Sequence, residues 1–257
     1  MNIVVFAALR QEIKHFLRQP GIKWSRLAGG RMAYGAQFEG EKLTVALTGM
    51  GMRNAAACAN DLLAAQRPDL VLSVGFAGAL YPEAQYGDIV CPEGAWLHPD
   101  GEFIDTGGPD FEEFYRLVSE KTVAGRGPIV TLSRWVENEK AALRDFTFTP
   151  PGEGSLSGDK KHLLRICDME TFPIARAALK NGSVFFGIRA ISDKSGEEIN
   201  FNPMEIADSR GQISTRLAML KFAAHPRLIP AAARLQKSSE TASLRLALAL
   251  DALLKSL

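Results

Sequence analysis

Cysteine is scarce in this sequence, and histidine forms no paired motif. The 257 residues include only three cysteines, Cys58, Cys91 and Cys167, and no CxxC pair joins them. This spacing excludes a disulfide scaffold and a four-thiolate zinc site, and it suits a reducing compartment. The four histidines stand apart, without an HExxH or HxxxH motif. We therefore expect no metal site of these types.

An excess of one charge and long apolar runs are also missing. The chain has 30 Lys+Arg against 29 Asp+Glu, a formal net charge of +1, which gives no basic field for nucleic acid. No apolar stretch approaches the ~20 residues of a membrane span. The opening run MNIVVFAAL lacks the basic start and long apolar core of a signal peptide. We expect a cytoplasmic protein with no nucleic-acid partner and no integral membrane segment.

What the sequence does contain is an alternation of strand-like and helix-like segments. Continuous apolar runs at residues 3–8, 70–74 and 184–191 are typical of strands buried on both faces of a sheet. Residues 54–66 and 172–181 are predicted to be helices between such strands. The alternation predicts an α/β fold with a mainly parallel central sheet and helices on both faces.

The length fits one domain, because single α/β domains often run to roughly 250 residues. We expect residues 1–257 to form a single domain, with residues 206–257 as a C-terminal helical extension. Pro226 and Pro230 are expected to break that extension into pieces. Its last part, residues 244–254, is dense in Leu and Ala and is expected to pack against its own domain or a partner.

Arg189 is the one cation inside an otherwise apolar strand, Val184–Ile191. A buried guanidinium costs several kcal/mol unless it is paired or faces a ligand-filled cleft. Two interpretations stay open from the residues alone. Arg189 is either one partner of a structural ion pair or part of a site for an anionic or polar ligand.

Acidic residues follow three of the predicted strands. Glu12, Glu170 and Asp193 each stand just beyond a strand end, where ligands bind in open α/β sheets. Carboxylates that share such a crevice suit acid–base chemistry on a glycosidic bond. Each acid also has a structural explanation, because Glu is favoured at a helix start and Ser-Asp commonly forms turns.

The segment Gly49-Met50-Gly51 follows a strand and opens a helix, as a dinucleotide-binding turn does. Asn54 stands where the third glycine belongs, and the next strand ends at Gly75-Phe76 rather than at an acid. These departures argue against a dinucleotide-dependent oxidoreductase, which a fluorescence titration with the cofactor would test. A P-loop is excluded because GxxxxGK[ST] does not occur.

Five segments occur in an order that carries a family resemblance, over about residues 1–195. They are the first strand with Glu12, Thr48-Gly49-Met50-Gly51 with Asn54-Ala55-Ala56, Val74-Gly75-Phe76-Ala77-Gly78 with Gly87-Asp88-Ile89-Val90, Asp168-Met169-Glu170, and Ile188-Arg189-Ala190-Ile191-Ser192-Asp193. Together they resemble the nucleoside phosphorylase/nucleosidase superfamily, particularly its methylthioadenosine/S-adenosylhomocysteine nucleosidase branch. The resemblance implies a phosphorylase/hydrolase-like fold.

The C-terminal part carries a second likeness. Asp208-Ser209-Arg210-Gly211 and His225-Pro226-Arg227-Leu228-Ile229-Pro230 resemble the end of the hopanoid-associated phosphorylase-like branch. That branch is thought to remove adenine from an adenosyl lipid precursor.

The resemblance implies three catalytic residues. Asp193 would protonate, or hydrogen-bond, N7 of the departing purine, which turns the base into a neutral leaving group. Glu12 would orient and deprotonate a water on the opposite face of the sugar. Arg189 would sit beside that nucleophile.

The resemblance also implies substrate-binding residues. Glu170 would accept hydrogen bonds from the ribose hydroxyls, and Met169 would pack beneath the sugar. Trp135 falls where the family stacks an aromatic ring on the base, although an ordinary half-buried aromatic explains it equally well. Val136 falls where backbone groups read the base edge.

The turn at Gly75 and Phe76 is expected to border the substrate, and it departs from the family pattern. Relatives usually have Ser or Thr where Phe76 stands, and some phosphorylases have a phosphate-binding Arg where Ser73 stands. Because phosphate needs several charge-assisted donors, hydrolysis is favoured over phosphorolysis, although Arg53 could partly compensate.

Together with these departures, the resemblance implies a nucleosidase that cleaves a purine nucleoside of adenosyl type with a modified 5′ group, using water and no cofactor or metal. A phosphate-dependent phosphorylase, including the hopanoid-associated branch, is the alternative. A second alternative is a nucleoside sensor without catalysis, although binding alone needs no poised acid and base. The resemblance also implies a homo-oligomer, a dimer or higher.

Overall fold

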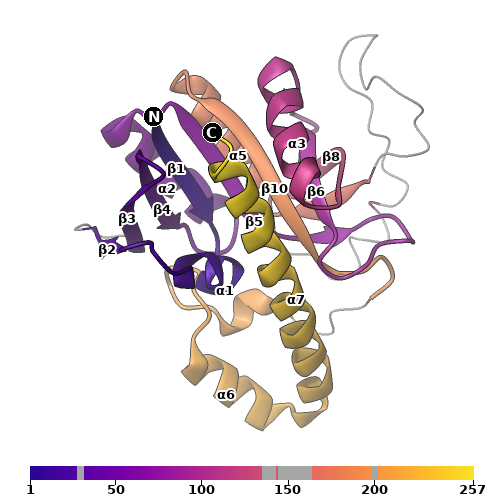
Figure 1. Cartoon of the computed structure of the whole chain (residues 1–257). Helices are drawn as coiled ribbons and strands as arrows, with labels where there is room; N and C mark the ends of the chain where they lie inside the picture. The colour runs from indigo at the N-terminus through magenta and orange to yellow at the C-terminus, as the bar shows by residue number, and fades with distance from the viewer. Residues whose placement is uncertain (28–31, 135–142, 144–163, 198–201) are drawn as a thin grey trace.

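The computed structural model describes residues 1–27, 32–134, 143, 164–197 and 202–257, and its centre is one ten-stranded sheet (Figure 1). The strands are β1 (Asn2–Ala7), β2 (Ser25–Arg26), β3 (Met32–Phe38), β4 (Glu41–Leu47), β5 (Leu70–Ala79), β6 (Ile89–His98), β7 (Phe103–Asp105), β8 (Ala124–Leu132), β9 (Ile166–Asp168) and β10 (Val184–Asp193). They lie in the order β10-β6-β8-β9-β5-β1-β4-β3-β2, with β7 paired to β6 and β10 paired also to β5.

Helices cover both faces of this sheet. They are α1 (Arg10–Ile13), η1 (Phe16–Arg18), α2 (Met52–Gln66), α3 (Pro109–Lys121), α5 (Thr171–Lys180), η3 (Pro203–Ile206), α6 (Thr215–Ala224), η4 (Pro226–Leu228) and α7 (Ile229–Leu254). Helices α1, α3 and α7 pack in one hydrophobic cluster, and α2 and α5 pack in another. The chain is thus an α/β single domain, as the alternation of segments predicts.

The sheet is mixed, and its longest pairings, β5–β10 and β6–β8, are parallel, as the predicted fold class requires. The pairs β1–β4, β1–β5, β5–β10, β6–β8 and β8–β9 are parallel. The pairs β2–β3, β3–β4, β5–β9, β6–β7 and β6–β10 are antiparallel. A continuous apolar run indicates only that both faces of a strand are covered. It does not distinguish parallel from antiparallel pairing with the neighbouring strand.

Strand β1 contributes buried side chains to the hydrophobic clusters on both faces of the sheet. Val5 faces the cluster shared with α7, and its neighbours Val4 and Phe6 face the cluster shared with α2. Successive side chains of a strand point to opposite faces, so a strand covered on both sides must be apolar throughout.

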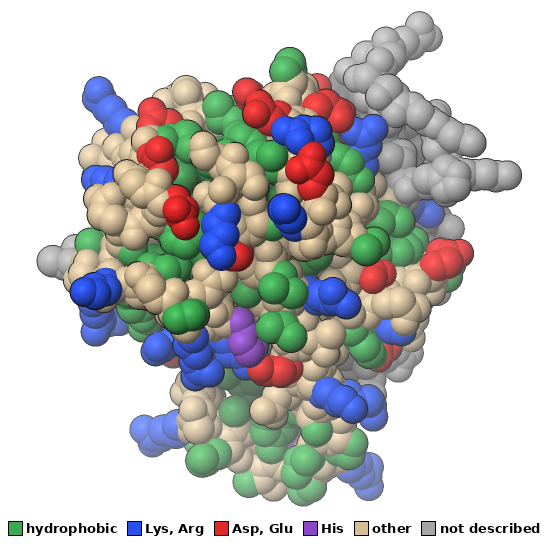
Figure 2. Space-filling view, viewed as in Figure 1, with side chains coloured by type: hydrophobic (Ala, Val, Ile, Leu, Met, Phe, Trp, Pro, Cys, Tyr) green, Lys and Arg blue, Asp and Glu red, His purple; other side chains and the backbone are tan. Residues whose placement is uncertain are grey.

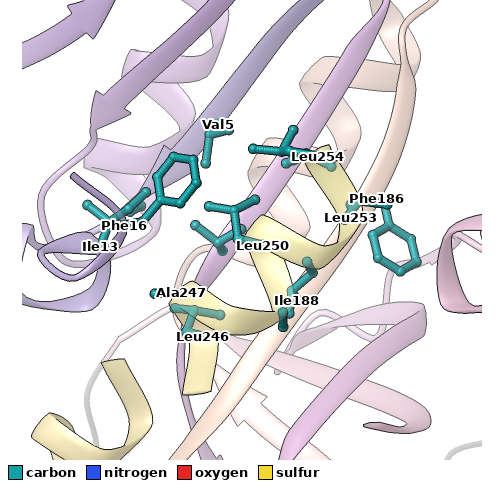
Figure 3. Packing of buried hydrophobic residues seen from close by; sticks show 14 of the residues in the cluster. Val5, Ile13, Phe16, Phe186, Ile188, Leu246, Ala247, Leu250, Leu253 and Leu254 are labelled. Atoms are coloured by element: carbon teal, nitrogen blue, oxygen red, sulfur yellow. The ribbon is translucent and has the colours of Figure 1, made fainter. Parts of the chain in front are cut away.

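Helix α7 packs its C-terminal half against the sheet (Figure 3). Leu246, Leu250 and Leu253 are at most 1% exposed and pack with residues of β1 and β10, among them Ile188. Burial of each such side chain stabilises the fold by about 1.5–3 kcal/mol. The Leu- and Ala-rich segment 244–254 therefore packs against its own domain. Among the described helices, none has the length and hydropathy that a membrane crossing requires.

Strands β5 and β10 run side by side well beyond the ends that the apolar runs predict. Their register pairs Arg189 with Gly75 and Ala190 with Phe76. The last part of β5 also pairs with β9, which ends at Asp168. These extensions bring the ends of β5, β9 and β10 together, and α1 follows β1 at the same place.

Candidate active site

Glu12 lies in α1 with its carboxylate fixed by two backbone amides. The N–H of Leu9 donates to Oε2 at 2.8 Å, and the N–H of Phe76 donates to Oε1 at 3.0 Å. The side chain is buried, and this burial raises the pKa of Glu12 above its usual range. The two amides and the charge of Arg189 act in the opposite direction. The result is an oriented acid that takes up protons more readily than a solvated glutamate.

Gly75 leaves the space that this carboxylate occupies. A Cβ placed on Gly75 would lie 3.0 Å from Oε1 of Glu12, closer than ordinary van der Waals contact. Phe76 is partly buried and packs against the cluster that α7 shares with the sheet. Phe76 thus contributes its backbone N–H to Glu12 and its ring to the core.

Arg189 is buried, with 1% exposed, and forms an ion pair with Asp168. Its Nε and Nη2 donate to Oδ2 of Asp168 at 3.2 and 3.1 Å. Nη1 donates to the carbonyl oxygens of Ser73 and Ile188, and Nη2 donates to the hydroxyl oxygens of Ser73 and Thr171. A guanidinium has five N–H donors, so these acceptors within the protein suffice for all of them.

Asp168 is the centre of a buried hydroxyl network that sequence reasoning did not assign to the site. Its Oδ1 accepts from Thr131 Oγ1 at 2.7 Å, and Oδ2 accepts from the N–H and hydroxyl of Thr171 at 2.8 and 2.6 Å. The signal available in the sequence was the acid directly before Met169-Glu170. Thr131 and Thr171 gave no signal, because isolated threonines in a strand and at a helix start are ordinary.

Glu170 accepts a hydrogen bond at 2.6 Å from the N–H of Gly51, the N-cap residue directly before α2. Burial, together with the charges of Asp168 and Glu12, raises the pKa of Glu170 to about 8. Helix N-termini stabilise negative charge. In this fold the Gly49-Met50-Gly51 turn therefore holds a carboxylate of the protein.

Met169 lies beside the same turn. A Cβ on Gly51 would lie 4.0 Å from Cε of Met169 and 3.6 Å from Cε of Met204, which comes from η3. The two thioethers thus flank the amide that binds Glu170. A methionine fills irregular space against an apolar surface without a fixed shape of its own.

A C-terminal segment closes over this turn, which sequence reasoning also did not anticipate. The N–H of Met50 donates to the carbonyl of Gly211 at 2.9 Å, and Gln212 Nε2 donates to the carbonyl of Ala8 at 2.8 Å. A Cβ on Gly49 would lie 1.9 Å from the carbonyl oxygen of Arg210. Gly49 has a φ of +84° and must remain a glycine for both reasons.

Asp193 ends β10 and is 8% exposed, and its Oδ1 accepts from Ser192 Oγ at 2.7 Å. It borders a cavity whose walls include Tyr86, Glu197 and Arg234. Tyr86 donates to Glu197, and burial together with this contact raises the pKa of Tyr86 to about 12. Helix α7 supplies Arg234 to this cavity, so the C-terminal helix reaches the surroundings of Asp193.

The structure thus brings most of the predicted site residues to one end of the sheet. The N–H of Phe76 binds Glu12, and Arg189 pairs with Gly75 in the register of β5 and β10. The charge of Glu12 raises the pKa of Glu170, and the charge of Arg189 lowers it. Trp135 and Val136 lie outside the described residues. Among the residues that are described, no group of three His, Cys, Asp or Glu side chains is placed to hold a metal ion.

The sequence that builds this fold matches a known family. The model of the phosphorylase superfamily matches residues 2–224. The chain belongs to the phosphorylase superfamily.

Individual relatives are distant. The chain is 26% identical over 227 residues to a 5′-methylthioadenosine/S-adenosylhomocysteine nucleosidase of Geobacillus kaustophilus, covering 85% of this chain and 95% of that protein. The structure of the Neisseria meningitidis enzyme of the same name, in complex with methylthio-immucillin-A, superposes with a TM-score of 0.70 at 20% identity, over 100% and 99% of the two chains. A futalosine hydrolase mutant of Helicobacter pylori superposes with a TM-score of 0.67 at 18% identity, over the whole of both chains. The fold is therefore shared with these two structures, and at these identities the substrate is a separate question.

Proposed function

We propose that this protein is a nucleosidase that hydrolyses the N-glycosidic bond of an adenosyl-type purine nucleoside with a modified 5′ group. The observation that carries the proposal is the difference between the hydrogen bonding of Glu12 and that of Arg189. Glu12 is a buried, oriented acid, and the donors of Arg189 are engaged by groups of the protein. Phosphate needs several charge-assisted donors, whereas water needs a base.

In the proposed mechanism Glu12 takes a proton from the attacking water. Base catalysis requires a carboxylate, so Arg189 supports the reaction by lowering the pKa of Glu12 against the effect of burial. Arg189 then acts as a positioning residue, which holds Asp168 and stabilises the charge of Glu12 without contacting the substrate.

Asp193 serves as the acid for the leaving purine, at N7. Its place in the wall of a cavity that Tyr86 and Arg234 also line supports contact with a ligand. Protonation of the base, or a hydrogen bond to it, lets the bond break through an oxocarbenium-like state. Trp135 would stack on the base, and backbone groups at Val136 would read its edge.

Glu170 binds the ribose hydroxyls, and Met169 packs beneath the sugar. The raised pKa of Glu170 refers to the site without substrate. Hydroxyls that donate to its carboxylate favour the charged form. Binding of the sugar and loss of a proton from Glu170 are therefore coupled in this proposal.

The second candidate is a phosphate-dependent phosphorylase of the hopanoid-associated, adenosyl-lipid branch. The observation in its favour is the contact of Arg210 and Gly211 with the Gly49-Met50 turn, because both belong to Asp208–Gly211, a segment that resembles this branch. The third reading, a sensor without catalysis, predicts binding without release of the base. The homo-oligomer expected from the resemblance remains part of the proposal.

Chromatography of base release from methylthioadenosine, adenosylhomocysteine, adenosine and inosine tests the proposal. We expect adenine release, with a preference among the 5′ groups. Asp193→Asn and Glu12→Gln should each reduce the rate by about 10²–10⁴-fold. Glu93→Gln, which changes a half-buried acid on β6, is the matched control and should retain the rate. Full activity of Asp193→Asn would reject its assigned role, and binding without release by the unmodified protein would favour the sensor.

A further inference from the structure

The surface formed by α6, η4 and the start of α7, residues 213–237, is exposed and apolar, and we call it the C-terminal tip. None of the ten residues of α6 is buried. Met219, Leu220 and Ile229 are 67%, 60% and 50% exposed. Figure 1 shows the tip projecting at the lower end of the molecule, beyond the sheet and its covering helices. The tip therefore presents large apolar side chains to the solvent, away from the hydrophobic core.

The same segment is strongly basic. Residues 213–237 contain five Lys and Arg and no Asp or Glu, which leaves 25 basic against 29 acidic residues in the remainder of the chain. The five are Arg216, Lys221, Arg227, Arg234 and Lys237, and Lys221 pairs with Glu205 of η3. Figure 2 shows hydrophobic side chains gathered at the lower end, with Lys and Arg side chains around them. The tip thus combines exposed apolar side chains with an excess of positive charge.

The two halves of α7 show that this exposure is a local property. In the C-terminal half, Leu246 and Leu250 are buried against the sheet. In the N-terminal half, Ile229 is exposed, and the neighbouring α6 packs against η3 and η4 rather than against the sheet. A contiguous exposed apolar patch with a polar rim marks an interaction surface.

The positive charge of the C-terminal tip distinguishes three candidate partners, which are a second copy of the chain, a nucleic acid and a lipid surface. A second copy packed symmetrically on the tip would bring two sets of basic residues together, and like charges across an interface oppose association. A nucleic acid would use the basic residues but would leave Met219, Leu220 and Ile229 in water. An anionic lipid surface accepts both the apolar side chains and the cations.

We infer that the C-terminal tip docks on anionic phospholipid bilayers. Met219, Leu220 and Ile229 enter the boundary between headgroups and acyl chains. Arg216 and Arg227 extend their charged ends to the phosphate level, as long basic side chains do at such boundaries. The contact is peripheral, and it is independent of the nucleosidase activity proposed above.

Sedimentation of the full chain with vesicles tests this inference. We expect binding at least about tenfold stronger to phosphatidylcholine vesicles that contain phosphatidylglycerol than to phosphatidylcholine alone, and loss of the difference at about 1 M salt, where the Debye length is ~3 Å. The double variants Met219→Ser/Leu220→Ser and Arg216→Gln/Arg227→Gln should each lower binding at least about tenfold. The matched controls Leu179→Ser and Lys180→Gln change an exposed leucine and an exposed lysine on α5 and should bind as the unmodified protein does.

Three outcomes would overturn the inference. The first is no binding of the unmodified protein to anionic vesicles, and the second is equal loss in the α5 controls. The third is a fall in molar mass by light scattering in Met219→Ser/Leu220→Ser without a change in vesicle binding, which would assign the tip to an interface between copies. Unchanged thermal unfolding of the tip variants, expected because α6 has no buried residue, confirms that they are folded. None of these measurements depends on the reaction that the site performs.

Discussion

The two sides of the candidate site satisfy their polar groups in different ways. On the side of Glu12 and Arg189, the charged groups are buried and bound by backbone amides, hydroxyls and each other. On the side of Asp193, the carboxylate borders a cavity formed with Tyr86 and α7. The first side is a buried network of an ion pair and hydrogen bonds, and the second side borders a cavity. Substitutions on the first side should therefore lower the free energy of unfolding more than substitutions on the second side.

The largest expected effect is that of Asp168→Asn. Removal of this charge leaves the buried Arg189 guanidinium without its counterion, which should lower the free energy of unfolding by about 3–5 kcal/mol. Urea denaturation measures the loss. Thr131→Val removes a hydroxyl that donates to Asp168 and accepts from the N–H of Phe172, and it should cost about 1–3 kcal/mol. Asp193→Asn should cost less than Asp168→Asn. Equal losses in Asp168→Asn and Asp193→Asn would remove the distinction between the two sides.

The next effect is a pH dependence of stability that comes from Glu170. Because the folded protein raises the pKa of Glu170 to about 8, the folded state holds this proton more tightly than the unfolded chain does. The contribution is fully present below the unfolded pKa of about 4.3 and is lost as pH rises towards about 8. Glu170→Gln should flatten this decline, as measured by urea denaturation at a series of pH values without substrate. An unchanged slope in the variant would show that Glu170 is not the group responsible.

Only part of this site could be predicted from the sequence. The sequence could predict that the acids and Arg189 lie near one another, because the ends of neighbouring parallel strands meet at one edge of a sheet. The sequence could not predict that Asp168 is the partner of Arg189. The antiparallel pair β5–β9 brings Asp168 to Arg189, and apolar patterning does not encode that pairing. The contact of Gly211 with Met50 joins segments far apart in the sequence, and neither carries a local signal for it.

A smaller effect is expected for Gly75→Ala, which presses on the carboxylate of Glu12 without removing it. The added Cβ would lie 3.0 Å from Oε1, so the carboxylate must shift by a few tenths of an ångström. We expect about a tenfold loss of turnover in the base-release assay, because small misplacements of a catalytic group are costly. Gly187→Ala is the matched control, since its Cβ would lie 3.0 Å from Cδ of Pro92 instead. If Gly187→Ala lost as much turnover, general strain in the sheet would explain both results.

The smallest effect is expected for Phe76→Ser, which introduces the hydroxyl that the family resemblance leads us to expect in this turn. Phe76 binds Glu12 through its backbone, so this contact remains. Because the donors of Arg189 stay engaged by the protein, the added hydroxyl alone should not make turnover depend on phosphate. Steady-state rates with and without phosphate check this expectation. Acceleration by phosphate in the variant would show that Phe76, rather than Arg189, keeps the anion out.

The most direct test of the central claim is the identity of the sugar product when the unmodified protein cleaves methylthioadenosine or adenosine in the presence of phosphate. The engaged donors of Arg189 and the oriented carboxylate of Glu12 predict the free sugar and adenine, at a rate independent of phosphate. A sugar 1-phosphate, formed only when phosphate is present, would contradict that prediction and would make the protein a phosphorylase.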